Sequence, residues 1–288
     1  MARFMKIFRY VSDLHLEMLP TINYSKITPL WNFKQGINDK YYLALLGDIG
    51  NPFTPNLQDF LSLVAPKYHK IFYIPGNHEY YNLNINLHSK NEHDYKLNEI
   101  CSQYDNIILL NNKSYDLDGI KIIGSTLWSN IDDKDKNHIS SVMNDYHLIK
   151  KIQKGQMTNI TTDDTNSWNR ASIKYIEKEI SNTSDPCIVL THHAPLYSNA
   201  KLNNYTAHPI YLNSRNNPAF HNDLIKLIRK PVVAWLYGHT HHTSSFKINN
   251  VIVATNQLGY IAENPPIDFD VYAYLDLDKL EIAQMEEM

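Results

Sequence analysis

Short apolar runs that end abruptly in polar side chains are the main pattern of this chain. Residues 232–237 form the clearest run, and Gly238 separates them from a group of histidines at 239–242. An apolar run of this length with such a boundary is typical of a buried strand. Four more runs end in the same way, at residues 13–15, 47–48, 77–78 and 192–193. Because ligands bind at the carboxyl ends of strands in an open α/β sheet, we expect these ends to form one site.

The remaining apolar positions predict helices and further strands. Leu57, Phe60, Leu61 and Val64 lie on one face of a helix. Further helices are expected at 92–103, 139–148, 166–182 and 220–228, the last stopped by Pro231. Strands are expected at 41–47, 70–74, 106–110 and 269–275. Residues 18–40 and 150–165 are mixed and polar, so we interpret them as a long loop and an insertion.

Two hairpins are embedded in this pattern. The strand–helix–strand order before residue 75 favours parallel pairing with a right-handed crossover. Residues 114–123 alternate around Asp118-Gly119, and residues 245–253 alternate around Asn249-Asn250, as hairpins do. The sheets should therefore be mixed. No linker or break in composition divides the chain, so we expect a single domain over residues 1–288.

Composition excludes several classes of protein. With 288 residues, 43% of them hydrophobic, the chain can bury a large core, and its net charge of −3 offers no extended surface for a nucleic acid. No apolar run is long enough for a signal peptide or a membrane span. Cys101 and Cys187 match no metal or redox spacing and are expected to be reduced thiols in or near the core. We expect a cytoplasmic protein that binds no membrane, and the sequence does not predict its oligomeric state.

The histidines are unevenly distributed. Seven of the 14 histidines fall within the five polar strand ends, which is not expected of scattered surface residues. His239 and His241 are two residues apart, close enough for both imidazoles to reach one metal cluster. Imidazole suits Zn²⁺, Fe, Mn²⁺ or Ni²⁺, and the pair needs further ligands from elsewhere in the chain. The strand ends therefore predict a metal site.

Taken in chain order, the five polar strand ends resemble the motifs of the calcineurin-like metallophosphoesterases. That family carries D-x-H, G-D, G-N-H-[DE], a single His and G-H-x-H. The matching residues are Asp13-Leu14-His15, Gly47-Asp48, Gly76-Asn77-His78-Glu79, His192 and Gly238-His239-Thr240-His241. The resemblance extends to about Tyr260 and is closer to a bacterial, cytosolic subgroup, through residues 124–128, 143–146 and 256–260. That subgroup tends to carry Pro and Arg where this chain has Gln257 and Leu258, which removes a possible cationic contact.

The resemblance implies a fold and a metal centre. The fold would be α/β, a four-layer α/β/β/α sandwich of two mixed sheets with a dinuclear site at strand C-terminal ends. One ion would be held by Asp13, His15, Asp48 and His241, and the other by Asp48, Asn77, His192 and His239, with Asp48 bridging. A metal-bridging hydroxide would be the nucleophile. The mixed nitrogen and oxygen ligands favour two divalent transition-metal ions, Mn²⁺, Fe or Zn²⁺.

The resemblance also suggests roles for residues in and beside these motifs. His78 would contact a substrate phosphate or protonate the leaving group, together with Asp48 as a catalytic residue, and the alternative is a structural histidine. Asn77 could also contact substrate. His193 either contacts substrate or orients its neighbours, and the two interpretations stay open. Glu17 and Glu79 are expected to be solvated or to support the ligands, because further carboxylates would cancel the positive charge of the site.

The favoured function is hydrolysis of a small phosphate mono- or diester, with a nucleotide-like substrate as one option. A protein phosphatase would continue the G-D block through Asp-Arg-Gly, whereas Asp48 is followed by Ile49-Gly50-Asn51. A nuclease of this family would need a basic strand-binding surface. A non-catalytic binding scaffold would have lost ligands, and this chain retains every one.

Residues 194–218 form a long segment with no periodicity, directly after the histidine pair. It is rich in Asn and Ser and contains Pro195, Pro209 and Pro218. Such long loops within a domain are usually lids or binding loops, and the alternative is a disordered surface loop. We predict that it overhangs the metals and selects the leaving group. Its candidate substrate-binding residues are Tyr197 and Arg215, with Tyr205, His208 and Tyr211 also available.

Overall fold

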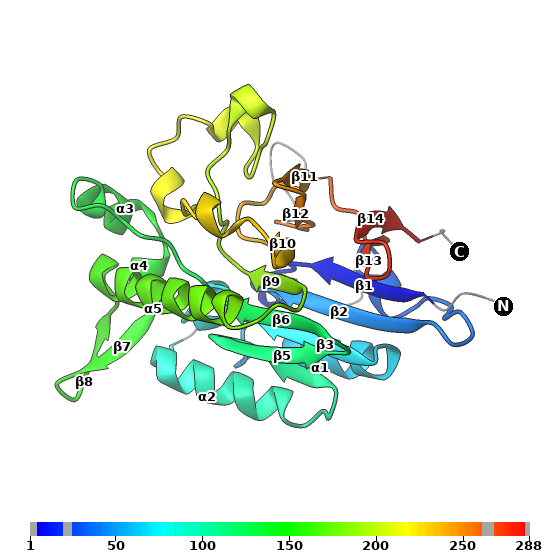
Figure 1. The fold of residues 1–288 in the computed structure, drawn as a ribbon. Helices are drawn as coiled ribbons and strands as arrows, with labels where there is room; N and C mark the ends of the chain where they lie inside the picture. Colours follow the sequence, from blue (N-terminus) through cyan, green and yellow to red (C-terminus); the bar gives the residue numbers. More distant parts are fainter. Residues whose placement is uncertain (1–4, 20–24, 84, 261–267, 286–288) are drawn as a thin grey trace.

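Two six-stranded sheets form the centre of the protein (Figure 1). The computed structural model describes residues 5–19, 25–83, 85–260 and 268–285. In spatial order, the first sheet contains β14 (Glu281–Gln284), β13 (Ala273–Asp276), β1 (Lys6–Val11), β2 (Lys40–Leu46), β3 (Lys70–Ile74) and β4 (Ile107–Leu109). The second contains β11 (Ser244–Ile248), β12 (Val251–Thr255), β10 (Val232–Tyr237), β9 (Cys187–Thr191), β6 (Ile120–Ser125) and β5 (Lys113–Leu117).

Both sheets are mixed, as the hairpin signals predict. Strands β1, β2, β3 and β4 pair in parallel, and β13 runs antiparallel to β1. In the second sheet β9 pairs in parallel with β6 and β10, and β10 with β12. The two expected hairpins are present, β5–β6 across Asp118-Gly119 and β11–β12 across Asn249-Asn250. The parallel pairing brings the ends of β1, β2 and β3 to one edge of the first sheet, and the ends of β9 and β10 to one edge of the second.

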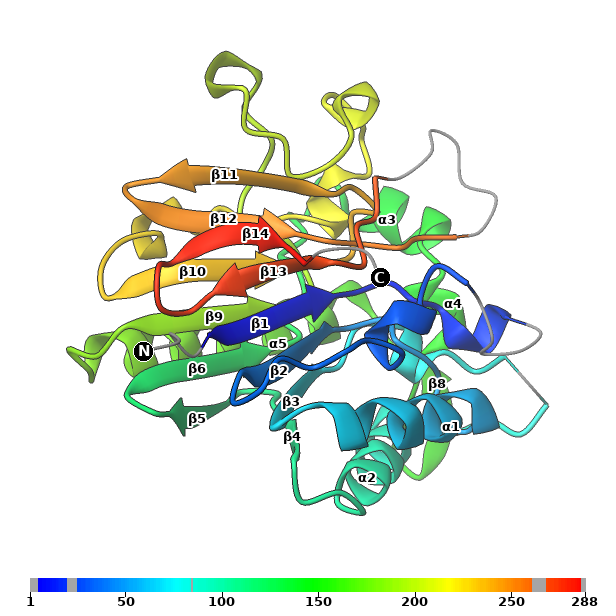
Figure 2. The ribbon, with the colours of Figure 1, turned by 90° about the vertical axis from the view of Figure 1, so that its right-hand side faces the viewer.

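Five helices complete the described fold. They are α1 (Pro55–Val64), α2 (Lys90–Cys101), α3 (Lys136–Val142), α4 (Asp145–Leu148) and α5 (Thr162–Ser181). Short 3-10 turns follow several strands and interrupt the longer loops: η1 (Leu16–Met18), η2 (Thr28–Leu30), η3 (Ala65–Lys67), η4 (His78–Tyr80), η5 (Ala200–Leu202), η6 (Pro209–Tyr211), η7 (Asn217–Ala219) and η8 (Ile225–Leu227). Figure 2 shows α1 and α2 side by side next to the first sheet.

Three buried apolar clusters define four layers. The first joins α1 and α2 to the outer face of the first sheet and includes Phe60 and Leu43. The second fills the space between the sheets and includes Phe72 and Leu236. The third joins the outer face of the second sheet to α5 through Trp235 and Ile176. Because successive strand residues face opposite sides, one strand serves two clusters. The expected α/β/β/α sandwich is confirmed.

The prediction of a helix at 220–228 is wrong. Only the single turn η8 forms there, and Ala194 pairs with His221 in an isolated bridge. Asn222 donates its backbone N–H to the carbonyl of Ala194 at 3.0 Å, and its side chain donates to the carbonyl of Trp128 at 2.8 Å. These contacts replace the hydrogen bonds of a helix, while apolar residues such as Ile228 still reach the core.

Other expected boundaries need smaller corrections. The helix expected at 139–148 is divided into α3 and α4 by an extended Met143. Within the expected insertion 150–165 the chain forms a hairpin of β7 (Lys150–Gln153) and β8 (Gln156–Asn159), and α5 begins at Thr162 rather than near 166. The closing strand, expected at 269–275, is β13 and begins only at Ala273. The loop expected at 18–40 contains η2, and its residues 20–24 lie outside the described residues.

Two smaller expectations are also tested. Cys101 and Cys187 are buried free thiols, as expected. Among the residues described, no helix is both long and apolar enough to cross a membrane.

Candidate active site

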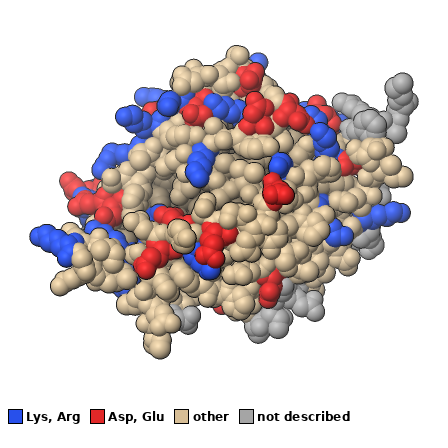
Figure 3. Space-filling model, turned by 90° about the horizontal axis from the view of Figure 1, so that it is seen from below, with Lys and Arg blue, Asp and Glu red and all other residues tan. Residues whose placement is uncertain are grey.

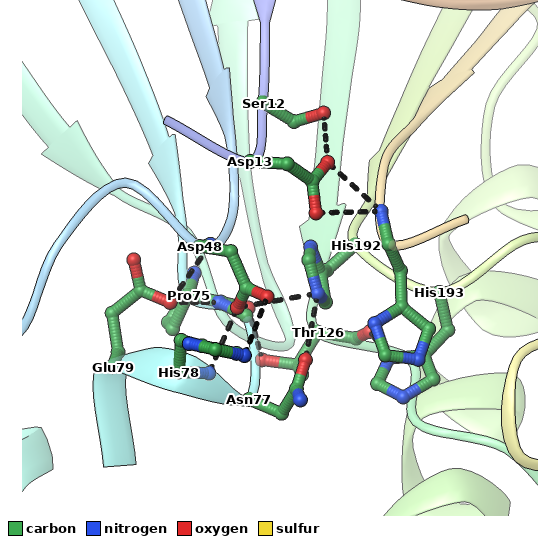
Figure 4. Close-up of polar contacts among 12 residues, drawn as sticks. Ser12, Asp13, Asp48, Pro75, Asn77, His78, Glu79, Thr126, His192 and His193 are labelled. Carbon is green, nitrogen blue, oxygen red and sulfur yellow. Dashed lines mark hydrogen bonds and ion pairs between the residues drawn. The ribbon is translucent and has the colours of Figure 1, made fainter. Parts of the chain in front are cut away.

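The polar ends of β1, β2, β3, β9 and β10 meet at one place, shown in Figure 4. Backbone hydrogen bonds tie neighbouring ends together. Asp13 donates its N–H to the carbonyl of Gly47 at 3.0 Å, and His15 donates to that of Asp48 at 3.0 Å. Gly238 donates its N–H to the carbonyl of His192 at 2.9 Å. The site therefore rests on the hydrogen-bonding framework of both sheets.

The backbone at the strand ends is unusual. Asp13, His15, Asp48, His239 and His241 all adopt left-handed φ angles, between 47° and 72°. Such angles are uncommon outside glycine, and at functional sites they mark backbone held in place by its surroundings. At these five positions the chain turns sharply after each strand and points the side chain inward.

Two motif glycines leave room for these turns. Gly47 has φ +86°, and a Cβ there would lie 2.3 Å from the Nδ1 atom of His192. A Cβ on Gly76 would lie 2.1 Å from the Oδ1 atom of Asp48. Neither position can accept a side chain without displacing a predicted ligand, which explains why glycine precedes both Asp48 and Asn77.

Three groups of side chains come close enough to hold metal ions. They are Asp13, His15 and His241; His15, Asp48 and His78; and Asp48, His192 and His239. Within each group the candidate ligand atoms lie within 4.8 Å of one another. The first and third groups correspond to the two predicted ion positions. Asp48 belongs to two of the three groups, as a bridging carboxylate would.

The hydrogen bonds of His192 test whether these residues suit a cation. The Nδ1 atom of His192 lies 2.9 Å from the carbonyl oxygen of Leu46, so Nδ1 carries the donated proton. Its Nε2 atom then faces Asn77 Oδ1 at 2.9 Å and Asp48 Oδ1 at 3.3 Å. Burial opposes protonation, but the carboxylates of Asp48 and Asp13 raise the pKa of His192 to about 9. The lone pairs of His192 Nε2, Asn77 Oδ1 and Asp48 Oδ1 therefore face one another, and this arrangement requires a proton or a metal ion between them.

Two further observations agree with a metal site. The Nε2 atom of His239 is buried and has no hydrogen-bond partner among the described residues. Burial, followed by neighbouring His193 and His192, lowers the pKa of His239 well below its usual value, which favours the neutral ring. The Nε2 atoms of His15 and His241 face each other at 3.0 Å. Imidazole nitrogens that face a shared point are ligands of the kind a divalent ion requires.

Asn77 is oriented by a neighbour that the sequence did not identify. Its side-chain nitrogen donates to Asp145 Oδ1 at 2.9 Å and to the hydroxyl of Tyr81 at 3.0 Å. The Tyr81 hydroxyl also donates to Asp145, at 2.6 Å. The amide nitrogen is thus held away from the site, and the amide oxygen faces His192. Asp145 reaches from α4 into the site, where burial raises its pKa.

Glu79 was expected to be solvated or supporting, and it supports the loops. It is fully buried and accepts backbone N–H groups from Asp48 at 2.9 Å, Ile49 at 2.8 Å and Gly76 at 2.6 Å. Burial and the neighbouring Asp48 carboxylate raise the pKa of Glu79 to about 7. Its two oxygens clamp the loop after β2 to the loop after β3. The position of Glu79 directly after the G-N-H block is the sequence signal for this supporting role.

Gln257 holds the loop after β10. Its Oε1 atom accepts the backbone N–H of His241 at 2.6 Å, and its Nε2 atom donates to the Thr240 hydroxyl at 2.9 Å and to the carbonyl of His242 at 3.0 Å. Leu258 is 6% exposed. Gln257 therefore holds the loop that carries the predicted ligands His239 and His241, and Leu258 contributes no cation.

His78 is paired with the buried carboxylate of Glu17. Their Nδ1 and Oε1 atoms lie 3.0 Å apart, and the Glu17 side chain has no exposed surface. On its other side, the Nε2 atom of His78 lies 3.2 Å from the Tyr260 hydroxyl and 3.9 Å from Asp48 Oδ2. Burial opposes the charge of His78, but Asp48 and Glu17 outweigh it and raise its pKa. Glu17, like Asp145, was not assigned this role from the sequence.

His193 lies behind the ligands. It is 1% exposed, its ring is 4.1 Å from that of His239, and Trp128 packs 5.4 Å from it on another side. Its Nδ1 atom contacts the carbonyl of Thr126 at 3.2 Å. Of the two open interpretations for His193, the structure favours orientation of neighbouring residues.

A cavity of about 350 Å³ opens above the predicted ligands. Its floor contains Asp48, Asn77, His78, His239 and His241. The walls contain Tyr81, Val142, Met143, Asn144, Ala207, Tyr211, Ser214, Asn216, Asn217, Phe220, His221, Thr240 and Tyr260. Part of the segment 194–218 therefore borders the site, on the same side of the molecule as α3 (Figure 1).

Of the residues of segment 194–218 predicted to be available for substrate, only Tyr211 lines this cavity, and Tyr197, Tyr205, His208 and Arg215 do not. Tyr197 borders a separate cavity of about 320 Å³ and stacks on His221 with ring centroids 5.2 Å apart. Arg215 is exposed, and its neighbours Ser214 and Asn216 line the cavity instead. For Tyr197 and Arg215, substrate contact stays a prediction.

Comparisons with known proteins agree with this geometry. Residues 8–243 match the family model of the calcineurin-like phosphoesterases. The chain is 56% identical to the uncharacterized protein L509 of Acanthamoeba polyphaga mimivirus, over 98% of this chain and 100% of that protein. It also resembles the crystal structure of the phosphopantetheinyl hydrolase PptH of Mycobacterium tuberculosis, with a TM-score of 0.66, 14% identity, and 89% and 90% of the two chains covered. The bacterial subgroup stays a prediction. The chain belongs to the calcineurin-like phosphoesterases and is a metal-dependent phosphoric ester hydrolase.

Proposed function

We propose that the protein hydrolyses a small phosphate mono- or diester at a centre of two divalent transition-metal ions. Asp13, His15, Asp48 and His241 would hold one ion. Asp48, Asn77, His192 and His239 would hold the other. When bound, the two ions polarise a phosphoryl oxygen and lower the pKa of a coordinated water. Mn²⁺, Fe and Zn²⁺ suit these imidazole, carboxylate and amide ligands better than Mg²⁺ or Ca²⁺.

One observation carries the proposal: two groups of ligand-type atoms converge on the floor of one cavity and flank Asp48. Isolated histidine clusters occur on many surfaces. Here six of the seven predicted ligands are at most 5% exposed, and five have strained backbones. Such an arrangement costs free energy, which a metal centre explains.

His78 would act on the ester itself. It lies at the floor of the cavity, and its Nδ1 atom is occupied by Glu17. Its Nε2 atom can therefore contact a phosphoryl oxygen or give a proton to the departing alcohol. Glu17 would be a positioning residue, because it fixes the imidazole and stabilises its protonated form without touching the substrate.

Two alternative functions are less well supported. A nuclease-type phosphodiesterase would need a basic surface, and on the face seen in Figure 3 Lys and Arg are interspersed with Asp and Glu. A protein phosphatase of this family would place an arginine near the metals, and no Lys or Arg lines the cavity within the described chain.

The proposal is tested with p-nitrophenyl phosphate and bis-p-nitrophenyl phosphate. Protein stripped by a chelator should hydrolyse neither ester, and Mn²⁺, Fe²⁺ or Zn²⁺ added singly should restore turnover of at least one. The pair of esters also decides between monoester and diester preference. Equal turnover before and after chelation, with metal loss verified, would refute the proposal.

A further inference from the structure

Tyr260 covers predicted metal ligands at the edge of the cavity. Its ring lies against that of His15, with centroids 4.6 Å apart, and meets the ring of His241 edge to face at 4.7 Å. Tyr260 is 41% exposed and lines the cavity, whereas His15 is 2% exposed and does not. Beside these ligands, the surface open to a substrate therefore includes the phenol ring of Tyr260.

The backbone that leads to Tyr260 is fixed to the end of the first strand. Leu258 donates its N–H to the carbonyl of Ser12 at 3.1 Å, and Gly259 donates to that of Asp13 at 3.0 Å. Gly259 has a left-handed φ of +68°, which glycine adopts at little cost. The chain turns there and places the next residue over the site. Tyr260 is thus positioned by the strand end that also carries ligands.

The hydroxyl of Tyr260 meets a ring nitrogen of His78. The Nδ1 atom of His78 lies 3.0 Å from Glu17 Oε1, and because a carboxylate accepts, Nδ1 carries the proton of that bond. The Nε2 atom of His78 lies 3.2 Å from the Tyr260 hydroxyl and 3.9 Å from Asp48 Oδ2. His78 is itself only 5% exposed. A leaving group therefore reaches Nε2 either by displacing the Tyr260 hydroxyl or through it.

We propose that Tyr260 is a further catalytic residue, whose hydroxyl contacts the leaving oxygen of the ester and passes to it the proton of His78. The inference rests on the proposed function and assigns the contact with the leaving oxygen to a second residue. While Nε2 carries no proton, the phenol donates to it. Once Nε2 is protonated, it donates to the phenol oxygen, and the phenol proton can point to the leaving oxygen.

The transfer balances in atoms and electrons. Water oxygen bonds to phosphorus, and the water loses a proton to solvent. As the ester P–O bond breaks, its electron pair stays on the leaving oxygen, which takes the phenol proton, while the phenol oxygen takes the Nε2 proton of His78. Because Tyr260 gains one proton as it loses another, the phenol never has to ionise. His78 ends the step neutral and regains its proton from solvent.

Tyr260→Phe removes the hydroxyl and keeps the ring. The substrates are the phenyl and p-nitrophenyl esters of the class, mono- or diester, that Mn²⁺-loaded wild-type protein hydrolyses. For the phenyl ester kcat/KM should fall by about 10²-fold, the low end for a lost acid–base group. The loss should be below about 10-fold for the p-nitrophenyl ester, whose leaving group needs little protonation. An unchanged or higher rate on the phenyl ester, or equal losses on both esters, would overturn the proposal.

Two further variants control this comparison. Tyr95→Phe, at a tyrosine 73% exposed on α2, should keep both rates. The double variant His78→Ala/Tyr260→Phe should lose no more on the phenyl ester than His78→Ala alone, because the phenol passes on the proton of His78. If the two losses multiply instead, Tyr260 acts independently of His78 and the transfer between them is refuted.

The contact between Tyr260 and His78 is tested without turnover. In Zn²⁺-loaded protein with ¹⁵N-labelled histidine, the Nε2 signal of His78 is identified by its loss in His78→Ala. This signal should move in Tyr260→Phe and stay in place in Tyr95→Phe, and an unmoved signal in Tyr260→Phe would overturn the proposal. Wild-type protein that binds metal but hydrolyses no ester would refute the proposed function and this inference with it. Hydrolysis that is insensitive to Tyr260→Phe would refute this inference alone.

Discussion

The floor and the walls of the cavity are built in opposite ways. The floor residues come from strand ends, are nearly all buried, and are held by backbone hydrogen bonds and by Glu79, Asp145 and Gln257. The walls come from irregular segments with exposed side chains such as Tyr211. Asp48, Asn77 and His78 on the floor each take part in several hydrogen bonds, whereas Val142 and Tyr211 on the walls are largely exposed.

This difference teaches where chemistry and specificity are encoded. A metal centre tolerates little displacement of its ligands, so it must be built on rigid strand ends. Recognition of a leaving group needs only surfaces of the right shape and polarity, which loops supply. We therefore expect floor substitutions to abolish turnover on every ester, and wall substitutions to change the preference among esters.

The largest effect is expected at Asp48, the residue common to two ligand groups. Asp48→Asn should lower kcat/KM on both aryl esters by on the order of 10⁴ or more, beyond the ~10²–10⁴ of one lost acid–base group. It should also reduce the number of ions bound. Asp59→Asn, on the exposed side of α1, is the matched control. Normal turnover in Asp48→Asn would remove the basis of the floor–wall distinction.

His78 comes next, because it acts on the ester but is not a predicted ligand. His78→Ala should retain its metal ions and lose about 10²–10⁴ in turnover. His147→Ala, at an exposed histidine of α4, controls for loss of an imidazole. Elemental analysis of both variants is the decisive readout, since loss of ions from His78→Ala would make His78 a ligand.

A smaller effect is expected at Glu17. Glu17→Gln keeps the size of the side chain but removes the negative charge that stabilises protonated His78, so turnover should fall by about 10²-fold on esters of poor leaving groups. The loss should shrink for p-nitrophenyl esters, whose leaving group needs little protonation. Glu99→Gln, whose partner Lys96 lies at the surface, is the control. An equal loss on all esters would indicate a structural role only.

The smallest effect on the floor is expected at Asp145. Asp145→Asn weakens its hold on the Asn77 amide and should reduce metal affinity by about 10-fold, at the low end for residues that orient ligands. Titration of the chelated protein with Mn²⁺ measures the change, and Asp105→Asn at an exposed position controls for loss of charge. Unchanged affinity would mean that Asn77 needs no such orientation.

The floor residues could be predicted because the strand ends that carry them have a clear sequence pattern. Each ligand follows an apolar run that must be buried, and parallel pairing brings such ends together. The spacing His239–His241 and the glycines before Asp48 and Asn77 carry the same information. The residues that hold the ligands were not predictable in the same way. Glu17 and Asp145 act through tertiary contacts, and nothing in their local sequence separates them from surface carboxylates.

The walls were predictable only as a segment. The absence of periodicity in 194–218 identified a loop, and Tyr211 does line the cavity, but so do Phe220 and His221 beyond its expected end. The apolar spacing around 220–228 suggested a helix, because it cannot reveal that Asn222 bonds to Ala194 and Trp128. Side-chain hydrogen bonds to the backbone compete with helices, and their partners are distant in sequence.

The most direct test of the account is the number of metal ions per chain. Protein stripped by a chelator, reconstituted with Mn²⁺ and freed of excess ions should contain two ions per chain by elemental analysis, and Asp48→Asn should contain fewer. Two ions, together with restored hydrolysis, would agree with both ligand groups as assigned. A reconstituted wild-type protein with no bound ion, and with hydrolysis independent of added metal, would contradict the central claim.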